Sequence, residues 1–552
     1  MWFMWCWKRL RETKKPTGTQ QPVGSRRHLC QDWCRGCRQF WVFGPYFLKN
    51  KMVVCCWRLR GSIDVELARF IALMQEKNMA ITCHGQQQLR VLGLTSSTKS
   101  MQPSDLFVAV PGAHFDPLEH LDQIASAGLT VIMGERPVND DRFVWLQVPH
   151  ARRALALAAA IFFPGQPNLC VGVTGTNGKT STVDLLRQIW SGAGINAASL
   201  GTLGLVRGGM EPQPGMTTPD QIALHKMLHT LSQEGCQHLA MEVSSHGLHQ
   251  HRVDGVTFQS GAFTNLSRDH LDYHVSMEAY LEAKLELVRR CIRKNGLLAS
   301  AATGEAAIAI HAACEKSGVR LWDYHKQDLN FFGFKVMSLS AEGAKVHITS
   351  QGHLQCVTVP FIARFQLENL ALAAVLAFDA GLELGHLALA MSGLQAVRGR
   401  MEFVGRHACG AAVFVDYAHT PDALETALKS LRQSEQFERI GVVFGCGGDR
   451  DRGKRPMMGE VAAAHADFSI VTDDNPRSED PQTIRDAILA THPRAIECGD
   501  RKEAICLGIK MLSNQDVLLV AGKGHEQGQV VGGKTLPFDD ADIVRTFLAE
   551  HG

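Results

Sequence analysis

The sequence of 552 residues predicts an α/β protein of three domains with mostly parallel sheets, on the strength of three patterns. Short apolar runs typical of buried strands alternate with stretches of helical spacing. One such run leads into a glycine-rich turn, residues 175–180, that precedes a helix-forming segment. Four runs beyond residue 397 each end in polar or glycine-rich sequence, as the strands of a Rossmann-like sheet do.

The expected elements follow in order along the chain. Apolar residues at helical spacing predict a helix over residues 65–74, and short strands alternate with polar or alanine-rich helices up to residue 163. Pro164-Gly165-Gln166-Pro167 indicates a linker. We therefore expect an N-terminal domain over 61–163, a central domain over 168–396 and a C-terminal domain over 397–552. The predicted strands include 106–110, 130–133, 239–243, 261–265, 413–415, 442–444, 469–472 and 517–521.

Residues 1–60 differ from the rest of the chain in composition. They hold 13 of the 57 Lys and Arg but only two of the 55 Asp and Glu, so the remainder carries 44 basic and 53 acidic residues. Six of the nine Trp and six of the 16 Cys also lie there. Cys30, Cys34 and Cys37 lack a fourth ligand at zinc-site spacing, so we expect no metal site. We interpret the segment as an atypical extension from a misassigned start, with Met52 as the true beginning; a disordered or partner-binding arm is the alternative.

The rest of the composition is that of an ordinary globular protein, with 45% hydrophobic and 20% charged residues. The acidic body gives no diffuse electrostatic attraction for nucleic acid. Apolar runs stay far shorter than a membrane span, and the cysteines beyond residue 60 are scattered as reduced thiols would be. We expect a cytoplasmic protein, without membrane insertion.

The turn Gly175-Thr176-Asn177-Gly178-Lys179-Thr180 is typical of a phosphate-binding loop. Its glycines let backbone N–H groups converge on phosphate oxygens, and the following helix N-terminus adds partial positive charge. Lys179 can reach the terminal phosphates, and the Thr180 hydroxyl can bind magnesium. The predicted ligand is ATP. An ordinary strand-to-helix turn is the alternative, because a glycine of the longer P-loop pattern is replaced by Val173.

Further motifs follow in a fixed order. The first two are Met241-Glu242-Val243-Ser244-Ser245-His246 and Arg268-Asp269-His270-Leu271-Asp272-Tyr273-His274. They are followed by Asp416-Tyr417-Ala418-His419, Gly445-Cys446-Gly447-Gly448-Asp449-Arg450 and Asp474-Asn475-Pro476-Arg477. With the P-loop, the chain from about residue 94 to the C-terminus resembles the Mur ligases, which add amino acids to a UDP-linked muramoyl precursor of peptidoglycan. Asp474-Asn475-Pro476-Arg477 resembles the version associated with meso-diaminopimelate.

The resemblance implies an amide-forming reaction. ATP phosphorylates the carboxylate of UDP-N-acetylmuramoyl-L-alanyl-D-glutamate, and the amine of meso-diaminopimelate displaces phosphate from the acyl phosphate. Lys179, Glu242, His270 and Lys284 match catalytic positions. Two Mg²⁺ ions are implied, with Thr180, Glu242, His270 and Lys284 as ligands and Lys284 carrying a CO₂-derived carbamate. From spacing alone, Glu242 could cap a helix and Lys284 could be a surface lysine paired with a glutamate.

The remaining site residues also follow from the resemblance. For ATP these are Gly175, Thr176, Asn177, Gly178, Lys179, Thr180, Asn369, Arg400 and Asp416. For the UDP precursor they are Thr98, Lys99, Thr217, Thr218, Ser244, Gln250 and Arg252. For diaminopimelate they are Arg450, Asp474, Asn475, Pro476, Arg477, Gly522 and Glu526.

The chain departs from the family pattern at three places. Ala363-Arg364-Phe365-Gln366 replaces a usual Gly-x-Phe-Asn near the adenine contact. Thr98-Lys99 stands where a Ser-Arg pair usually contacts uridine, and Asp116-Pro117 replaces Asp-Gly. Lys99 still supplies a point charge, although without the paired donors of arginine. These departures leave the uridine contacts open.

Several alternatives stay open on the sequence. Arg477 could be a surface ion-pair residue after a turn at Asn475-Pro476. A lysine-adding homologue and a folylpolyglutamate synthetase are the rival enzymes. The Asp-Asn-Pro-Arg block argues against both. A catalytically silent nucleotide-sugar binding protein is the rival from another class. We expect a monomer.

Overall fold

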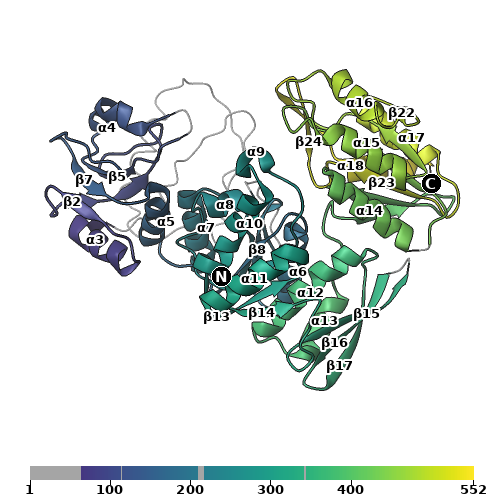
Figure 1. The fold of residues 1–552 in the computed structure, drawn as a ribbon, viewed down its shortest axis with the longest axis horizontal. Helices are drawn as coiled ribbons and strands as arrows, with labels where there is room; N and C mark the ends of the chain where they lie inside the picture. The colour runs from purple at the N-terminus through teal and green to yellow at the C-terminus, as the bar shows by residue number, and fades with distance from the viewer. Residues whose placement is uncertain (1–63, 113–114, 209–216, 341–342, 435, 552) are drawn as a thin grey trace, which may run out of the picture. The chain divides into compact units, whose positions relative to one another are not determined.

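The computed structural model describes residues 64–112, 115–208, 217–340, 343–434 and 436–551. The expectations for residues 1–60, including the possible start at Met52, lie outside these described residues. The predicted α/β class with mostly parallel sheets is confirmed (Figure 1).

The first large sheet has five strands. Strands β4 to β7 are parallel, and β2 pairs with β7 in the antiparallel sense. In spatial order the strands are β2 (Thr82–His84), β7 (Val144–Gln147), β6 (Val131–Gly134), β5 (Asp105–Val108) and β4 (Gly93–Thr95). The flanking helices are α3 (Leu67–Glu76), η1 (Pro117–His120), α4 (Leu121–Ser126) and α5 (Ala151–Phe162). The helix expected from residue 65 begins two residues later, because Val65 belongs to β1 (Val65–Glu66), which pairs with β3 (Arg90–Val91).

The second sheet has seven strands, parallel except at one edge, where β10 pairs antiparallel with β9. In spatial order they are β10 (Gly204–Arg207), β9 (Ala197–Gly201), β11 (His238–Glu242), β8 (Leu169–Thr174), β12 (Phe258–Phe263), β13 (Ile292–Ser300) and β14 (Arg320–Asp323). One core contains α6 (Lys179–Gly192), α12 (Arg364–Asp379) and α13 (Leu384–Ser392). A second core contains α7 (Gln221–Gln233), α8 (Ser245–His249) and α11 (Gly304–Ser317).

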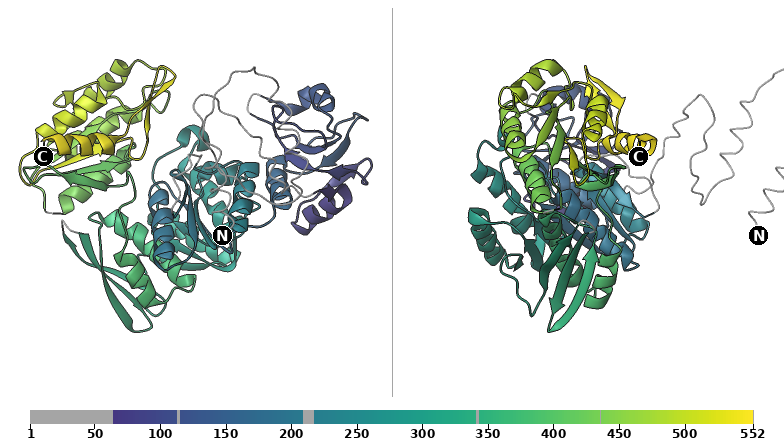
Figure 2. Two further views of the ribbon diagram at one scale, coloured as in Figure 1. Left: turned by 180° about the vertical axis from the view of Figure 1, so that it is seen from behind. Right: turned by 90° about the vertical axis from the view of Figure 1, so that its right-hand side faces the viewer.

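Other elements extend this part of the chain. Short helices α9 (Leu271–His274) and α10 (Met277–Glu286) follow β12, and a π-helical segment, η2 (Leu287–Cys291), leads into β13. A three-stranded antiparallel sheet, which the sequence did not lead us to expect, packs against α12 and α13 (Figure 2). Its strands are β15 (Gly333–Ser340), β16 (Gly343–Ser350) and β17 (His353–Val359).

The third large sheet has six strands and is parallel from β19 onward. In spatial order they are β18 (Glu402–Arg406), β19 (Ala412–Asp416), β23 (Val517–Ala521), β20 (Ile440–Phe444), β21 (Phe468–Val471) and β22 (Ile496–Glu497). One core holds α14 (Pro421–Gln433), α15 (Lys454–His465) and α16 (Pro481–Leu489), and another holds α17 (Arg501–Lys510) and α18 (Asp540–His551). A hairpin of β24 (Gly528–Val531) and β25 (Lys534–Pro537) follows β23. The loops after β19, β20, β21 and β23 meet at the carboxyl edge, where ligands of such sheets bind.

None of the helices in the described part of the chain has the length and apolar character needed to span a bilayer.

A buried ion pair holds α17 and α18 beneath the loop that follows β23. Arg501 Nε and Nη2 donate to the Asp540 carboxylate at 2.8 and 2.7 Å, and both side chains are fully buried. Arg501 Nη2 also donates to the carbonyl of Ala521, the last residue of β23, at 2.9 Å. The pair therefore ties two helices to the strand end that carries Gly522.

We predict that Arg501→Met destabilises this region by about 3–5 kcal/mol, because it leaves the Asp540 carboxylate buried without a countercharge. Hydrogen exchange of peptides from α17 and α18 measures the opening free energy. The control is Arg432→Met, which removes a pair with Asp467 whose side chains are 45% and 38% exposed and should cost less than about 1 kcal/mol. Equal effects of the two variants would contradict the prediction.

Candidate active site

The predicted phosphate-binding turn lies between β8 and α6, and the backbone conformation at Gly175 and Gly178 requires glycine. Gly175 and Gly178 have φ of +142° and +83°, values that residues other than glycine rarely adopt. A Cβ at Gly178 would lie 2.4 Å from Asn369 Oδ1, so Asn369 packs directly on the turn. Helix α6 begins at Lys179 and therefore directs its N-terminal N–H groups at this turn.

Lys179 folds over the turn. Its Nζ donates to the carbonyls of Gly175 at 3.0 Å and Thr176 at 2.7 Å. Burial lowers its pKa, while nearby Glu242 and Asp269 raise it and Arg400 lowers it further. The turn thus lies among side chains of both charges contributed by distant parts of the chain.

The side chain of Lys284, in α10, contacts the same turn. Its side chain is 1% exposed, and its Nζ donates to the Gly175 carbonyl at 2.7 Å and lies 4.2 Å from the centroid of the Tyr280 ring. Burial, and then the charge of Lys179, hold the pKa of Lys284 well below its usual range. The alternative of a surface lysine paired with a glutamate is therefore wrong.

Glu242 is the last residue of β11 and is buried. Its carboxylate accepts hydrogen bonds from the N–H of Thr202 at 2.8 Å and from the Thr202 hydroxyl at 3.2 Å. The cap of the next helix, α8, is instead Ser244, whose hydroxyl accepts from the N–H of Gly247. The helix-capping alternative for Glu242 is therefore wrong as well.

His270 precedes α9 with φ of +54°, an uncommon conformation for a residue other than glycine. Its ring packs edge-on against His246, with 4.8 Å between centroids. Burial lowers the pKa of His270; Asp269 raises it, and Lys179 and Lys284 lower it. His270 thus lies close to Lys179 of the turn and to Lys284, which contacts the turn.

Two of the four predicted metal ligands offer oxygen donors that suit magnesium. Glu242 and Thr180 supply the hard oxygen donors that Mg²⁺ prefers. Thr180 Oγ1 accepts a hydrogen bond from Arg400 Nη2 at 2.9 Å. Within the described residues, no group of three or more His, Cys, Asp or Glu side chains gathers at one point.

The predicted nucleotide residues Arg400 and Asp416 come together where the second and third sheets are joined along the chain. The Arg400 guanidinium lies 4.5 Å from the centroid of the Tyr417 ring, and its buried Nε has no partner among the described residues. Asp416 accepts from the N–H groups of Met401 at 2.6 Å and Ala418 at 2.7 Å, and burial raises its pKa to about 6. Gln366, at the position that departs from the family, donates to the Arg400 carbonyl at 3.2 Å.

Five residues predicted to bind the UDP precursor form one network beside Glu242. The Thr218 hydroxyl donates to the Glu242 carbonyl at 3.1 Å and lies 3.1 Å from Ser244 Oγ. Arg252 donates to the Thr218 carbonyl and to Gln250 Oε1. Thr217 Oγ1 lies 3.1 Å from Thr202 Oγ1. All five predicted residues are therefore linked to the strand that ends at Glu242.

Thr98 and Lys99 lie elsewhere, on the loop between β4 and β5 of the first sheet. The Thr98 carbonyl accepts from Gln123 Nε2 at 3.4 Å, and Lys99 is exposed. The structure does not bring them into contact with the network beside Glu242.

The third sheet collects the residues predicted to bind diaminopimelate. Asn475 Nδ2 donates to Glu526 Oε2 at 2.8 Å, and a Cβ at Gly522 would lie 2.7 Å from Asp474 Oδ2. Lys523, a residue that the sequence reasoning missed, is buried among these side chains. Its position between Gly522 and Glu526 was the available signal.

The two arginines of this group differ in their surroundings. Arg477 is half-buried with φ of +55°, and its Nη1 donates to the Gly448 carbonyl at 2.6 Å. It therefore holds the loop after β20 rather than a surface carboxylate, and the ion-pair alternative is wrong. Arg450 is exposed, and Pro476 is buried. A Cβ at Gly448 would lie 2.0 Å from the Pro476 carbonyl oxygen, so the loops after β20 and β21 are tightly packed.

Tyr417 is a second residue that the sequence reasoning did not select. Burial raises the pKa of Tyr417 to about 12. The carboxylates of Glu526, Asp474 and Glu242 also raise it, and Arg400 lowers it. Tyr417 thus lies between the predicted nucleotide and amino-acid residues. Its place in Asp416-Tyr417-Ala418-His419 was the signal that could have found it.

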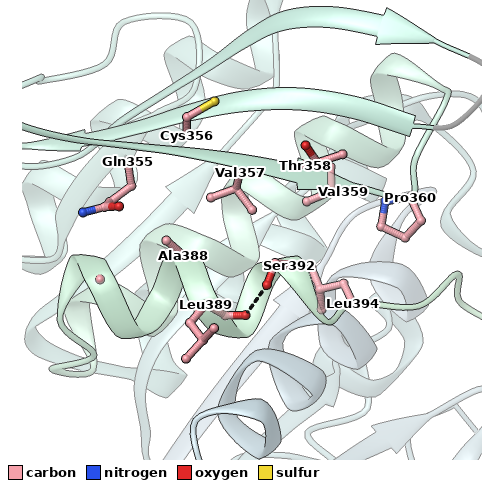
Figure 3. Close-up of a pocket in the computed structure, with 11 residues that line it drawn as sticks. Gln355, Cys356, Val357, Thr358, Val359, Pro360, Ala388, Leu389, Ser392 and Leu394 are labelled. Carbon is pink, nitrogen blue, oxygen red and sulfur yellow. Dashed lines mark hydrogen bonds between the residues drawn. The ribbon is translucent and has the colours of Figure 1, made fainter.

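A separate pocket lies between β17 and α13 (Figure 3). Its eleven lining residues are both apolar, such as Val357 and Leu389, and polar, such as Gln355 and Thr358, and the Ser392 hydroxyl donates to the Leu389 carbonyl at 2.7 Å. None of the predicted site residues lines it. It is therefore distinct from the candidate active site.

Comparison with known proteins gives consistent matches. Residues 173–377 match the Mur ligase middle domain, and residues 399–524 match the Mur ligase glutamate ligase domain. The UDP-N-acetylmuramoyl-L-alanyl-D-glutamate–2,6-diaminopimelate ligase of Bradyrhizobium diazoefficiens is 44% identical over 466 residues, 84% of this chain and 96% of that protein. The enzyme of the same name from Caulobacter vibrioides is 42% identical over 475 residues, again 84% and 96%.

Solved structures agree. One described as a UDP-N-acetylmuramoyl-L-alanyl-D-glutamate–2,6-diaminopimelate ligase aligns with a TM-score of 0.65 and 29% identity, covering 89% of this chain and all of that one. A folylpolyglutamate synthase of Mycobacterium tuberculosis aligns with a TM-score of 0.57 at 15% identity, over 67% of this chain and 91% of that one, which shows a shared fold alone. The chain belongs to the Mur ligase family.

Proposed function

We propose that this protein is the ATP-dependent ligase that joins meso-diaminopimelate to UDP-N-acetylmuramoyl-L-alanyl-D-glutamate, in the cytoplasm and as a monomer. The observation that carries the proposal is the burial of Lys284 against the carbonyl of the phosphate-binding turn, in a chain whose relatives bear that name. A second amine at this position has no role in merely holding a nucleotide, which argues against a silent binding protein.

The reaction has two steps. The glutamate carboxylate of the precursor attacks the γ-phosphorus of ATP, ADP leaves, and an acyl phosphate forms. The amine of diaminopimelate then attacks the acyl carbon, loses a proton and expels inorganic phosphate. The residues that hold ATP are proposed to be Gly175, Thr176, Asn177, Gly178, Lys179, Thr180, Asn369, Arg400 and Asp416. Lys179 and Arg400 neutralise charge on the transferring phosphoryl group, and the task of the protein is chiefly alignment.

Thr180, Glu242, His270 and Lys284 are proposed to hold two Mg²⁺ ions. Bound there, magnesium would neutralise the charge of the phosphates and the attacking carboxylate. The neutral amine of Lys284 takes up CO₂ and releases one proton, so that its nitrogen keeps one hydrogen while gaining a carboxylate. That remaining N–H can still donate to the Gly175 carbonyl, 2.7 Å away. The lowered pKa of Lys284 supports this modification because it favours the reactive neutral amine.

Two further groups complete the proposal. The muramoyl dipeptide would bind Thr217, Thr218, Ser244, Gln250 and Arg252, whose hydrogen-bonded network reaches Glu242, with Thr98 and Lys99 at the uridine end. Diaminopimelate would bind Arg450, Asp474, Asn475, Pro476, Arg477, Gly522 and Glu526. A guanidinium suits its distal carboxylate, and Glu526 suits its ammonium.

The direct test is phosphate release from ATP in the presence of the UDP-muramoyl dipeptide and a panel of amino acids. Release with diaminopimelate and not with lysine or glutamate supports the proposal. Release with lysine would assign the lysine-adding activity, and absence of release with every amino acid would favour a silent binding protein.

We predict that Lys284→Ala lowers ligase turnover by about 10²–10³-fold, because it removes an anion that positions the second magnesium ion. Small carboxylates such as acetate should restore part of the rate by filling the vacated space. The control is Lys294→Ala, which removes an exposed lysine of β13 and should leave turnover unchanged. Full turnover of Lys284→Ala without added carboxylate would remove Lys284 from the mechanism.

We also predict that Arg477→Ala raises the KM for diaminopimelate by roughly a hundredfold, which corresponds to about 3 kcal/mol for a lost charge-assisted contact. The KM values for ATP and the UDP precursor should change little, because their residues lie on other loops. Arg494→Ala, at an exposed turn between α16 and β22, is the control. An unchanged KM for diaminopimelate in Arg477→Ala would disprove this assignment while leaving the ligase activity in place.

A further inference from the structure

Lys523 is enclosed behind the predicted amino-acid site. Its side chain is completely buried, and its Nζ lies 3.0 Å from Asn475 Oδ1, 3.0 Å from Glu526 Oε2 and 3.8 Å from Asp474 Oδ1. Glu526 is 33% exposed at its side chain. A ligand arriving from solvent can therefore reach Glu526 but not Lys523.

Lys523 is one of three groups that fix which way the Asn475 amide points. Asn475 Oδ1 accepts from Lys523 Nζ and from the N–H of Val530 at 2.9 Å, and Nδ2 donates to Glu526 Oε2. The oxygen of a side-chain amide accepts hydrogen bonds and its nitrogen donates them. Two donors on one side of Asn475 therefore require its Oδ1 to point toward them. Lys523 thus holds both Asn475 and Glu526 in place from behind.

Lys523 also sets the charge of the group. Asp474 and Glu526 bring two carboxylates to the loops after β21 and β23, and Lys523 contributes one positive charge between them. With the predicted Arg477 counted, two carboxylates face two cations, which suits an amino-acid end that carries an ammonium and a carboxylate together. Without Lys523, one carboxylate would stay uncompensated, which would weaken the hold of Arg477 on a carboxylate and attract a lone ammonium.

We propose that Lys523 is a positioning residue that orients Asn475 and Glu526 and makes their site prefer diaminopimelate over lysine. The inference rests on the proposed ligase function. Stability is an insufficient reason for placing a buried charged group here, because replacing a whole buried ion pair by apolar side chains of similar size is commonly neutral.

The test uses Lys523→Met in the full chain. Phosphate release is followed with ATP, the UDP-muramoyl dipeptide, and either meso-diaminopimelate or L-lysine. The KM for diaminopimelate should rise about tenfold or more, and the preference for diaminopimelate over lysine in kcat/KM should fall by a similar factor. The KM for ATP should stay within about twofold. Lys429→Met, which removes an exposed lysine paired with Glu425, should change none of these values.

Each outcome decides between positioning and stability. A wild-type KM and an unchanged preference in Lys523→Met would overturn the proposal. If that variant does not fold, Lys523→Gln replaces it, because glutamine keeps a donor for Asn475 but removes the charge. Lys523→Gln should lower the preference for diaminopimelate over lysine without raising the KM for diaminopimelate. An unchanged preference in Lys523→Gln, or failure of both variants to fold, would assign Lys523 to stability. If the wild type releases no phosphate with diaminopimelate, the ligase proposal itself fails, and this one falls with it.

Discussion

Two lysines share one backbone carbonyl, and the rest of the candidate site depends on this constraint. Lys179 Nζ and Lys284 Nζ both donate to the carbonyl oxygen of Gly175, at 3.0 and 2.7 Å. Two ammonium groups so close repel each other in a buried place, and the pKa of Lys284 is lowered by burial and by Lys179. One amine is thereby favoured in its neutral form. Burial against this turn thus lowers the pKa of a lysine that is distant along the chain.

The backbone conformations at the site indicate preorganisation. His270 and Arg477 both adopt positive φ; the His270 ring contacts His246 of α8, and Arg477 donates to a carbonyl of the loop after β20. Such conformations cost of order 1 kcal/mol or more and persist only where the surroundings impose them. The buried pair of Arg501 and Asp540 supports the strand end beside Gly522 in the same way. The strand ends that carry the side chains proposed to contact substrates are therefore held by neighbouring elements.

Much of the fold was predictable because its signals are local. The glycines of the turn, the apolar runs and the polar strand ends each show their structure within a few residues, and the predicted α/β class is confirmed. The antiparallel sheet of β15, β16 and β17 was missed, since its edge strands expose many residues and lack a continuous apolar run. Burial of Lys284 and Lys523 could not be derived from spacing, because it depends on partners 109 and 48 residues away. The role of each site residue remains a proposal.

The central claim, that the lysine pair at Gly175 makes Lys284 a CO₂ acceptor, is tested most directly by ¹³C NMR of the protein equilibrated with ¹³C-labelled bicarbonate. The account predicts a carbamate carbon resonance in the wild type that is absent in Lys284→Ala and retained in Lys294→Ala. A wild-type spectrum without that resonance, or a resonance that survives in Lys284→Ala, would contradict it.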